Sequence, residues 1–121
     1  MGLAAILGGL SVAAGAFASH ALREKLSERA LQIFETAARY QMYHAIALLL
    51  VALLLSRAEF PQLTLVAAGW AFIIGIAIFS GSLYALSLTD IKVLGAITPL
   101  GGAAFLAGWG CLAIAAFNFK Y

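Results

Sequence analysis

Four long runs of the 121-residue sequence contain no charged residue, and they constrain the fold more than any other feature. The runs cover residues 1–22, 40–56, 60–89 and 93–119. A helix that crosses the hydrocarbon core of a bilayer needs roughly 17–25 consecutive, mostly apolar residues. Each run is therefore long enough to cross a membrane once, and the chain is predicted to be a polytopic membrane protein.

The composition agrees with these runs. Hydrophobic residues make up 64% of the sequence, charged residues make up 10%, and the mean hydropathy is +1.04. In soluble domains about a quarter of the residues are charged. The net charge of +2 is spread over short segments, so the basic patch that nucleic-acid binding requires is missing. Nucleic acid is therefore excluded as a partner.

The spanning segments are predicted to be helices, because lipid offers the backbone no hydrogen-bonding partner and four strands cannot close a barrel. We expect an all-α fold, an integral membrane bundle of four transmembrane helices in a single transmembrane domain that covers residues 1–121. The helices are expected at about 2–20, 27–56, 62–88 and 94–118, with 40–56 as the crossing part of the second.

The charged segment before residue 40 is predicted to be an amphipathic helical extension of the second helix. Its apolar residues recur at three- and four-residue spacing, and most of its charges occupy the other face. Ser27 is a suitable N-cap, since its hydroxyl can accept a backbone N–H of the first turn. We expect the extension to form a collar at the membrane interface, with a partner-docking surface as the alternative.

The positions of Lys and Arg predict the orientation, because cytoplasmic connections carry the excess of these residues. One side of a four-helix chain carries five of them, and the other side carries two. The five are Arg23, Lys25, Arg29, Arg39 and Lys92, and the two are Arg57 and Lys120. Both termini are therefore expected on the non-cytoplasmic side of a cell (inner) membrane.

Glycines in the first and last helices are spaced seven residues apart. The pairs are Gly2/Gly9, Gly8/Gly15, Gly95/Gly102 and Gly101/Gly108. Seven residues are two helical turns, so each pair lies on one face and permits close helix approach. We expect each of these two helices to pack against one of its neighbours through its glycine face. The glycine-free second helix is expected at the periphery or at a subunit contact.

Polar residues gather in the half of the spans that adjoins the more basic connections. This polar cluster comprises His20, Tyr40, Gln41, His44, Ser80, Ser82 and Thr98. It is either a cavity open to one leaflet or a hydrogen-bonded network that joins the helices, and the network is favoured. In the cavity interpretation, His20 and His44 at facing helix ends would bind a haem, a chlorin, a metal or a quinone.

The sequence does not favour an enzyme. The predicted spans lack a charged residue, which disfavours an ion-coupled transporter, and they lack a nucleophile paired with a base. Cys111 is the only cysteine, so it has no partner for a disulfide or a CxxC pair. No catalytic residue, no metal site and no cofactor are assigned.

Four stretches of the chain resemble the YgdD-like family of small bacterial membrane proteins, which also has mitochondrial relatives. They are residues 15–22 (GAFASHAL), 34–45 (FETAARYQMYHA), 79–84 (FSGSLY) and 95–102 (GAITPLGG). The resemblance covers nearly the whole chain and implies four membrane helices. It implies no activity and no ligand residue, because the family has no established function. Glu28 departs from the proline that the family pattern leads us to expect.

These observations favour an accessory, assembly or structural subunit of a larger membrane complex, or a homo-oligomer embedded in the lipid bilayer. The first alternative is a membrane redox protein that binds haem, a pigment or a quinone through His20 and His44. The second alternative is a small-molecule transporter. The scarcity of polar residues in the other half of the spans argues against a polar path across the membrane.

Overall fold

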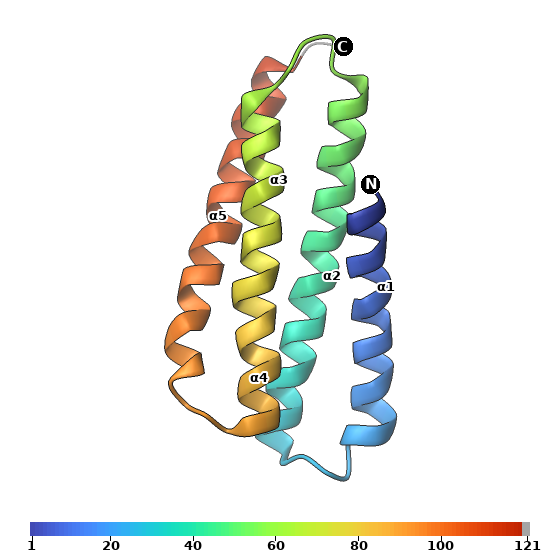
Figure 1. The fold of residues 1–121 in the computed structure, drawn as a ribbon, viewed down its shortest axis with the longest axis vertical. Helices are drawn as coiled ribbons and strands as arrows, with labels where there is room; N and C mark the ends of the chain where they lie inside the picture. The colour runs from blue at the N-terminus through green and yellow to red at the C-terminus, as the bar shows by residue number, and fades with distance from the viewer. Residues whose placement is uncertain (120–121) are drawn as a thin grey trace.

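The computed structural model describes residues 1–119, which are helical apart from short connections (Figure 1). Helix α1 (Gly2–Phe17) continues through the π-helical turn η1 (Ala18–Leu22). Helix α2 covers Glu28–Arg57. The third helix consists of α3 (Leu63–Gly75), the π-helical turn η2 (Ile76–Ser80) and α4 (Gly81–Thr89). Helix α5 covers Leu94–Asn118.

Four continuous helices are long and apolar enough to cross a membrane: Gly2–Leu22, Glu28–Arg57, Leu63–Thr89 and Leu94–Asn118. The predicted all-α fold with four spanning helices is confirmed. The charged segment forms the first part of α2 without a break, as predicted. The Ser27 hydroxyl accepts a hydrogen bond from the Ala30 N–H at 3.1 Å and caps this helix.

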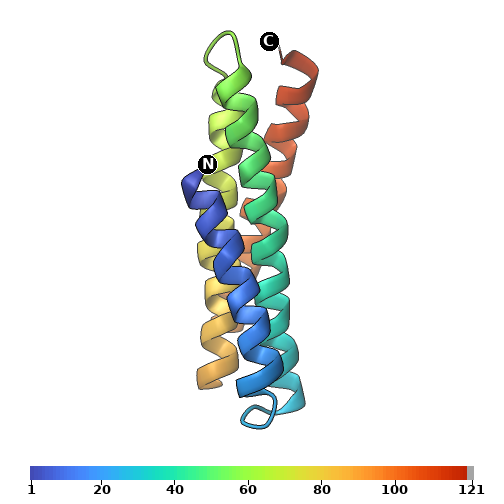
Figure 2. The same cartoon turned by 90° about the vertical axis from the view of Figure 1, so that its right-hand side faces the viewer.

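The helices pack mainly in chain order. Helix α1 packs on α2, α2 packs on the helix made of α3, η2 and α4, and α5 packs on that same helix. Figures 1 and 2 show α1 and α5 on opposite sides of the molecule, with the two central helices between them. Helices α1 and α5 therefore each contact one main neighbour and leave much of their surface open.

The prediction that the glycine-free second helix lies at the periphery is wrong. Helix α2 packs against α1 on one side and against α3–α4 on the other. Its buried positions include Ala37, Ala38, Ala45 and Ala47. Alanine is small enough to let helix backbones approach closely in a membrane, so α2 does not need glycine for this purpose.

The amphipathic first part of α2 also packs against its neighbouring helices. Phe34 is buried with Ala18 and Leu22 in one apolar cluster, and its ring meets the ring of Tyr84 at a centroid distance of 4.9 Å. The apolar stripe of the first α2 turns therefore contacts α1 and α4. As a consequence, the residues near position 40 lie well inside the helix packing.

The glycine faces differ between α1 and α5. A Cβ atom added to Gly101 would lie 2.4 Å from the backbone N of Phe79, so α5 packs through its glycine face as predicted. Helix α1 instead buries Ala4, Ser11 and Ala18, which are also seven residues apart. The predicted glycine face is therefore not the main contact of α1: a face of two alanines and a serine packs against α2, and of the glycines only Gly8 comes close to it, near Ala45.

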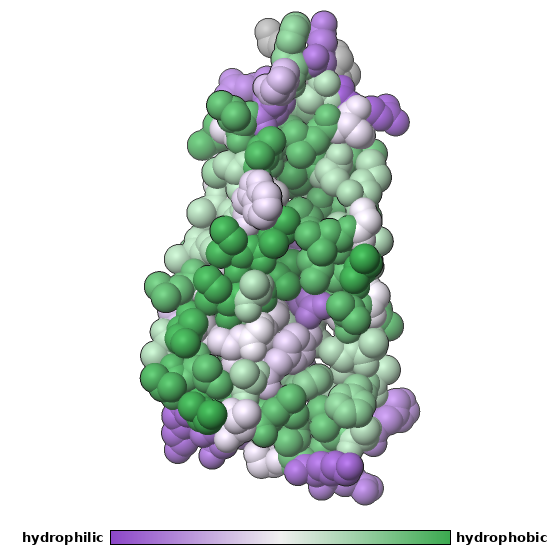
Figure 3. Space-filling model, viewed as in Figure 1, coloured by the Kyte–Doolittle hydropathy of each residue, from purple (hydrophilic) through white to green (hydrophobic). Residues whose placement is uncertain are grey.

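The surface follows the distribution expected of a protein in a bilayer. Figure 3 shows hydrophilic residues gathered at the two ends and an apolar band between them. A small paler patch with some hydrophilic surface interrupts this band. The large hydrophobic side chains exposed on the chain include Leu3, Ile46, Leu63 and Phe117. These side chains are suited to contact with lipid.

Candidate functional site

Two polar side chains hold α1 against α2. The Ser11 hydroxyl donates a hydrogen bond to the carbonyl oxygen of Ala38. The Gln41 Nε2 group donates to the carbonyl oxygen of Leu7 at 2.8 Å. Both acceptors are backbone carbonyls of helix interiors, so these bonds fix the relative height of two antiparallel helices.

Further hydrogen bonds extend this connection to the third helix and to α5. Tyr84 donates its hydroxyl to Gln41 Oε1 at 2.8 Å, and the Ser80 hydroxyl donates to the carbonyl oxygen of Ala37 at 2.8 Å. The Ser82 and Thr98 hydroxyls lie 2.6 Å apart. The structure thus places four residues of the predicted cluster, Gln41, Ser80, Ser82 and Thr98, in bonds that join all four spanning helices.

His44 lies apart from these bonds, in an aromatic environment between α2 and α5. Trp109 can only donate its ring N–H, and it does so to His44 Nε2 at 3.1 Å. His44 Nδ1 therefore carries the proton and donates to the carbonyl oxygen of Tyr40 at 2.7 Å. The imidazole also stacks on Phe105 with a centroid distance of 3.5 Å. Both ring nitrogens are engaged and the ring is held rigidly.

The structure does not bring His20 and His44 together. His20 is exposed at the end of η1, whereas His44 is buried. The α1–α2 hydrogen bonds place His20 level with the start of α2, about 15 residues or roughly 23 Å before His44. The expectation that the two rings approach each other is wrong, because α1 packs beside the first half of α2 as well as its crossing part, and its end lies level with the start of α2.

This arrangement does not fit a ligand pair for haem, a chlorin or a metal. The nitrogens of His44 are already engaged by Trp109 and Tyr40. Within residues 1–119, no group of three or more His, Cys, Asp and Glu side chains is placed to hold a metal ion. The redox alternative through His20 and His44 therefore gains no support from the geometry.

A groove of about 360 Å³ lies between α1 and α2, and we call it the α1–α2 groove. It is lined by Ser11, Gly15, Ser19, Glu35, Ala38, Arg39, Met42 and Tyr43. Arg39 stands ten residues after Arg29 on the same helix, which is roughly 15 Å further from the charged end. Neither Arg39 nor Glu35 makes a hydrogen bond or an ion pair within the described chain. The groove thus holds two unpaired charges beside the middle part of α1, one of the four candidate membrane spans.

The importance of Arg39 and Glu35 was not predicted from the sequence, because both residues were assigned to the collar. The signal that could have identified them is the unbroken helix from the Ser27 cap to Arg57. Because this helix is unbroken, its charged first half packs beside α1, and Ala38, next to Arg39, is level with Ser11 in the middle of α1.

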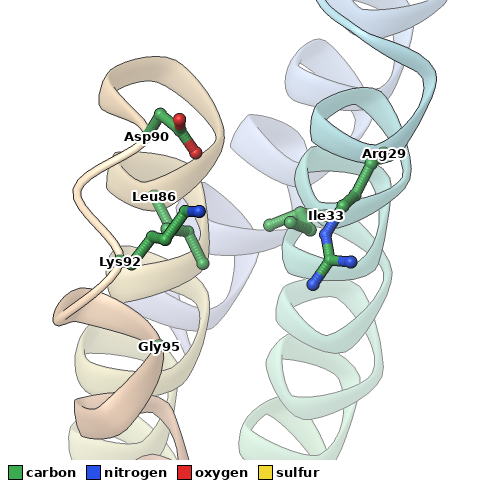
Figure 4. A pocket seen from close by; sticks show the side chains of 6 residues that line it. All are labelled: Arg29, Ile33, Leu86, Asp90, Lys92 and Gly95. Atoms are coloured by element: carbon green, nitrogen blue, oxygen red, sulfur yellow. The ribbon is translucent and has the colours of Figure 1, made fainter.

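Two further cavities lie between α2 and α5. The first, about 450 Å³, is at the charged end and is lined by Arg29, Ile33, Leu86, Asp90, Lys92 and Gly95 (Figure 4). We call it the basic cavity. The second, about 560 Å³, is deeper and is lined by Tyr40, His44, Phe79, Pro99, Gly102, Ala103, Phe105, Leu106 and Trp109. We call it the aromatic groove.

The family of the chain follows from comparison with known sequences. Residues 14–102 match the model of DUF423, a protein family of unknown function. The chain belongs to the DUF423 family. The UPF0382 membrane protein YwdK of Bacillus subtilis is 44% identical over 97% of this chain and 94% of its own length. The UPF0382 membrane protein SH2409 of Staphylococcus haemolyticus is 44% identical over 98% of each chain.

A third relative, the UPF0382 membrane protein SAB0533 of Staphylococcus aureus, is 46% identical over 98% of each chain. No solved structure matches the chain. The relatives are named as membrane proteins and their names give no activity, so the chain is a multi-pass membrane protein of uncharacterised function.

Proposed function

We propose that this protein is an accessory or assembly subunit that binds another membrane protein through the α1–α2 groove. The observation that carries the proposal is the unpaired charge of Arg39 and Glu35 beside the middle part of α1. An arginine at the centre of a spanning helix costs roughly 2.5–3.5 kcal/mol on insertion scales. A partner helix that supplies polar groups in this groove would offset that cost.

The shape of the groove supports a helical partner. Its α1 wall begins at Ser11, which is buried against α2, and continues through the more open Gly15 and Ser19 at four-residue spacing. Small residues at this spacing let a second helix approach closely, and close approach strengthens both van der Waals packing and hydrogen bonding in lipid. The expected partner is therefore a transmembrane helix with small residues and a polar or charged side chain at the depth of Arg39.

The test is recovery of a partner in mild detergent, with three variants compared. Arg39→Leu removes the charge, Gly15→Leu fills the groove, and Arg57→Leu removes an arginine at the opposite end as the control. We expect one protein to co-purify in fixed stoichiometry with the wild type and with Arg57→Leu. The two groove variants should lose it, while their thermal unfolding stays like that of the wild type.

Two results would contradict this proposal. One is a protein that is monomeric and without a stoichiometric partner both in mild detergent and in native membrane particles. The other is a partner that is retained equally by Arg39→Leu and Gly15→Leu. A partner that proves to be a second copy of this chain would make the protein a homo-oligomer, and the same variants would then yield the monomer.

We also propose that the protein lies in the cell (inner) membrane, with the α1–α2 and α4–α5 connections in the cytoplasm. Arg23, Lys25, Arg29 and Lys92 support this orientation even after Arg39 is assigned to the groove. Lys120, which was counted among the basic residues of the non-cytoplasmic side, lies outside the described residues. A reporter enzyme that is active only outside the cytoplasm should be active when fused after residue 119.

We infer in addition that the chain is related to the YgdD-like family. The stretches 34–45 and 95–102 support this relationship, and they contribute Gln41, His44 and Thr98 to interhelical contacts. An alignment of the two families that pairs these stretches without gaps is the expected result, and an alignment that fails to pair them would contradict it.

A further inference from the structure

We propose that the side of the molecule between α2 and α5 binds one anionic phospholipid. The headgroup occupies the basic cavity, and an acyl chain follows the aromatic groove toward the middle of the membrane. This site shares no lining residue with the α1–α2 groove, so the proposal does not depend on the proposed function.

The two cavities lie along one continuous strip of the surface. On α2 they use Arg29, Ile33, Tyr40 and His44, at spacings of four, seven and four residues. On α5 they use positions 95, 99, 102 and 106, at spacings of four, three and four residues. Both spacings keep positions on the same helix face. The basic cavity and the aromatic groove therefore follow each other along the same side of the molecule.

The basic cavity matches the charge of a lipid phosphodiester. Figure 4 shows Arg29 on α2 facing Asp90 and Lys92 from the other side of the cavity. None of the three side chains is engaged in an ion pair within residues 1–119. Two cations and one carboxylate give the cavity a net charge of +1, which complements a headgroup of charge −1.

The carboxylate of Asp90 limits which lipid headgroups fit the basic cavity. Arg29 and Lys92 can donate to the phosphate oxygens. The Asp90 carboxylate can only accept hydrogen bonds and repels a second anionic group, so it suits a headgroup with hydroxyl donors beyond the phosphate. A glycerol headgroup has this chemistry. Phosphatidylglycerol is therefore the expected lipid, in preference to phosphatidylcholine, which has neither a net charge nor a hydroxyl.

The aromatic groove provides the place for a chain. Gly102 and Ala103 leave room on α5, and the rings of Phe79 and Phe105 form an apolar floor, with ring centroids 5.3 Å apart. Ile33, Leu86 and Gly95 form an apolar lining within the basic cavity itself. A lipid entering from the bilayer therefore meets charge only at the end where its phosphate lies.

Binding is measured by native mass spectrometry of the whole protein in detergent, with phosphatidylglycerol, phosphatidylethanolamine, phosphatidylcholine and inorganic phosphate added separately. We expect saturable binding of one phosphatidylglycerol. Arg29→Gln and Lys92→Gln should each weaken the affinity for phosphatidylglycerol roughly fivefold, because one basic residue near the membrane surface contributes about 1 kcal/mol. Arg57→Gln, at the other end of α2, is the control and should bind like the wild type.

A second pair of variants tests the acyl chain. Ala103→Trp fills the aromatic groove, whereas Ala107→Trp adds the same volume at an exposed position of α5 outside it. Only the first should reduce lipid binding. If inorganic phosphate displaced phosphatidylglycerol at equal concentration, the ligand of the site would be free phosphate, and the lipid assignment would be overturned. Equal binding of all three lipids, or equal effects of both tryptophans, would also overturn the proposal.

Discussion

Helices α1 and α5 carry the same glycine spacing and use it in opposite ways. In α5, a Cβ at Gly101 would lie 2.4 Å from the Phe79 backbone N, and a Cβ at Gly108 would lie 2.6 Å from the Phe72 ring. In α1, Gly2 and Gly9 have no neighbouring atom within 4 Å of such a Cβ. Helix α5 therefore buries Gly101 and Gly108 against its neighbour, whereas of the α1 glycines only Gly8 approaches α2, where an added Cβ would lie at the ordinary contact distance of 3.9 Å from the Cβ of Ala45.

Small residues at seven-residue spacing therefore predict a helix face that another helix can approach closely. The spacing does not predict whether that other helix belongs to the same chain or to a partner. In α5 the neighbour is an aromatic residue of the same chain. In α1 the inward face is Ala4, Ser11 and Ala18, and two side-chain hydrogen bonds add to its attachment to α2. The outward face of α1 is therefore available for a partner.

The largest expected effect is that of Gly101→Val. The added side chain would collide with the Phe79 backbone, which cannot move without shifting η2. We expect a loss of about 3 kcal/mol in the free energy of unfolding, the upper end for overpacking. Gly9→Val on α1 should change it by less than about 0.5 kcal/mol. Reversible unfolding in mixed micelles measures both, and similar losses would erase the distinction between the helices.

Gly108→Ala is expected to have the next largest effect. Its methyl group would press on the ring of Phe72, a side chain with no exposed surface. The ring has little space to withdraw, so we expect a loss of about 1–2 kcal/mol in the free energy of unfolding. Gly110→Ala, on the same helix with open space around it, is the matched control. A stable Gly108→Ala protein would mean that α5 is packed more loosely than described.

Gln41→Leu tests how α1 is held. The substitution removes the donor to the Leu7 carbonyl oxygen and the acceptor for the Tyr84 hydroxyl. Interhelical hydrogen bonds in membranes contribute about 0.6 kcal/mol on average and up to about 2 kcal/mol. We expect faster amide hydrogen exchange in α1 and unchanged exchange in α5. Equal acceleration in both helices would show that Gln41 supports the fold as a whole.

Ser11→Ala should have the smallest of these effects. It removes one hydrogen bond, to the Ala38 carbonyl oxygen, and leaves a side chain that still fits the small-residue face of α1. The expected loss in the free energy of unfolding is about 0.6 kcal/mol. A much larger loss in the same unfolding assay would show that this hydrogen bond, rather than close packing, keeps α1 in place.

The fold could be predicted from the sequence because lipid imposes simple demands. Charge-free runs must be helical and must match the thickness of the membrane. The Ser27 cap fixed the start of α2 for the same local reason, since a hydroxyl before the first turn satisfies a free backbone N–H. Both are short-range properties that a sequence contains.

The depth of each residue could not be predicted in the same way. The position of His44 depends on where α2 starts and on its height relative to α1, which the bonds from Ser11 and Gln41 fix. The sequence gives no signal for the pairing of His44 with Trp109, 65 residues later. A polar cluster inferred from the sequence therefore indicates which residues take part in the network, and it does not indicate which residues pair with each other.

The most direct test of the central claim is site-specific photo-crosslinking at two positions of similar depth. Tyr43 lines the α1–α2 groove, and Leu106 lines the aromatic groove near Trp109, which contacts His44. Each is replaced by a photoreactive phenylalanine analogue and activated in intact membranes. The two proposals together predict a discrete protein adduct from position 43 and lipid adducts from position 106. Protein adducts from position 106 with none from position 43 would contradict it.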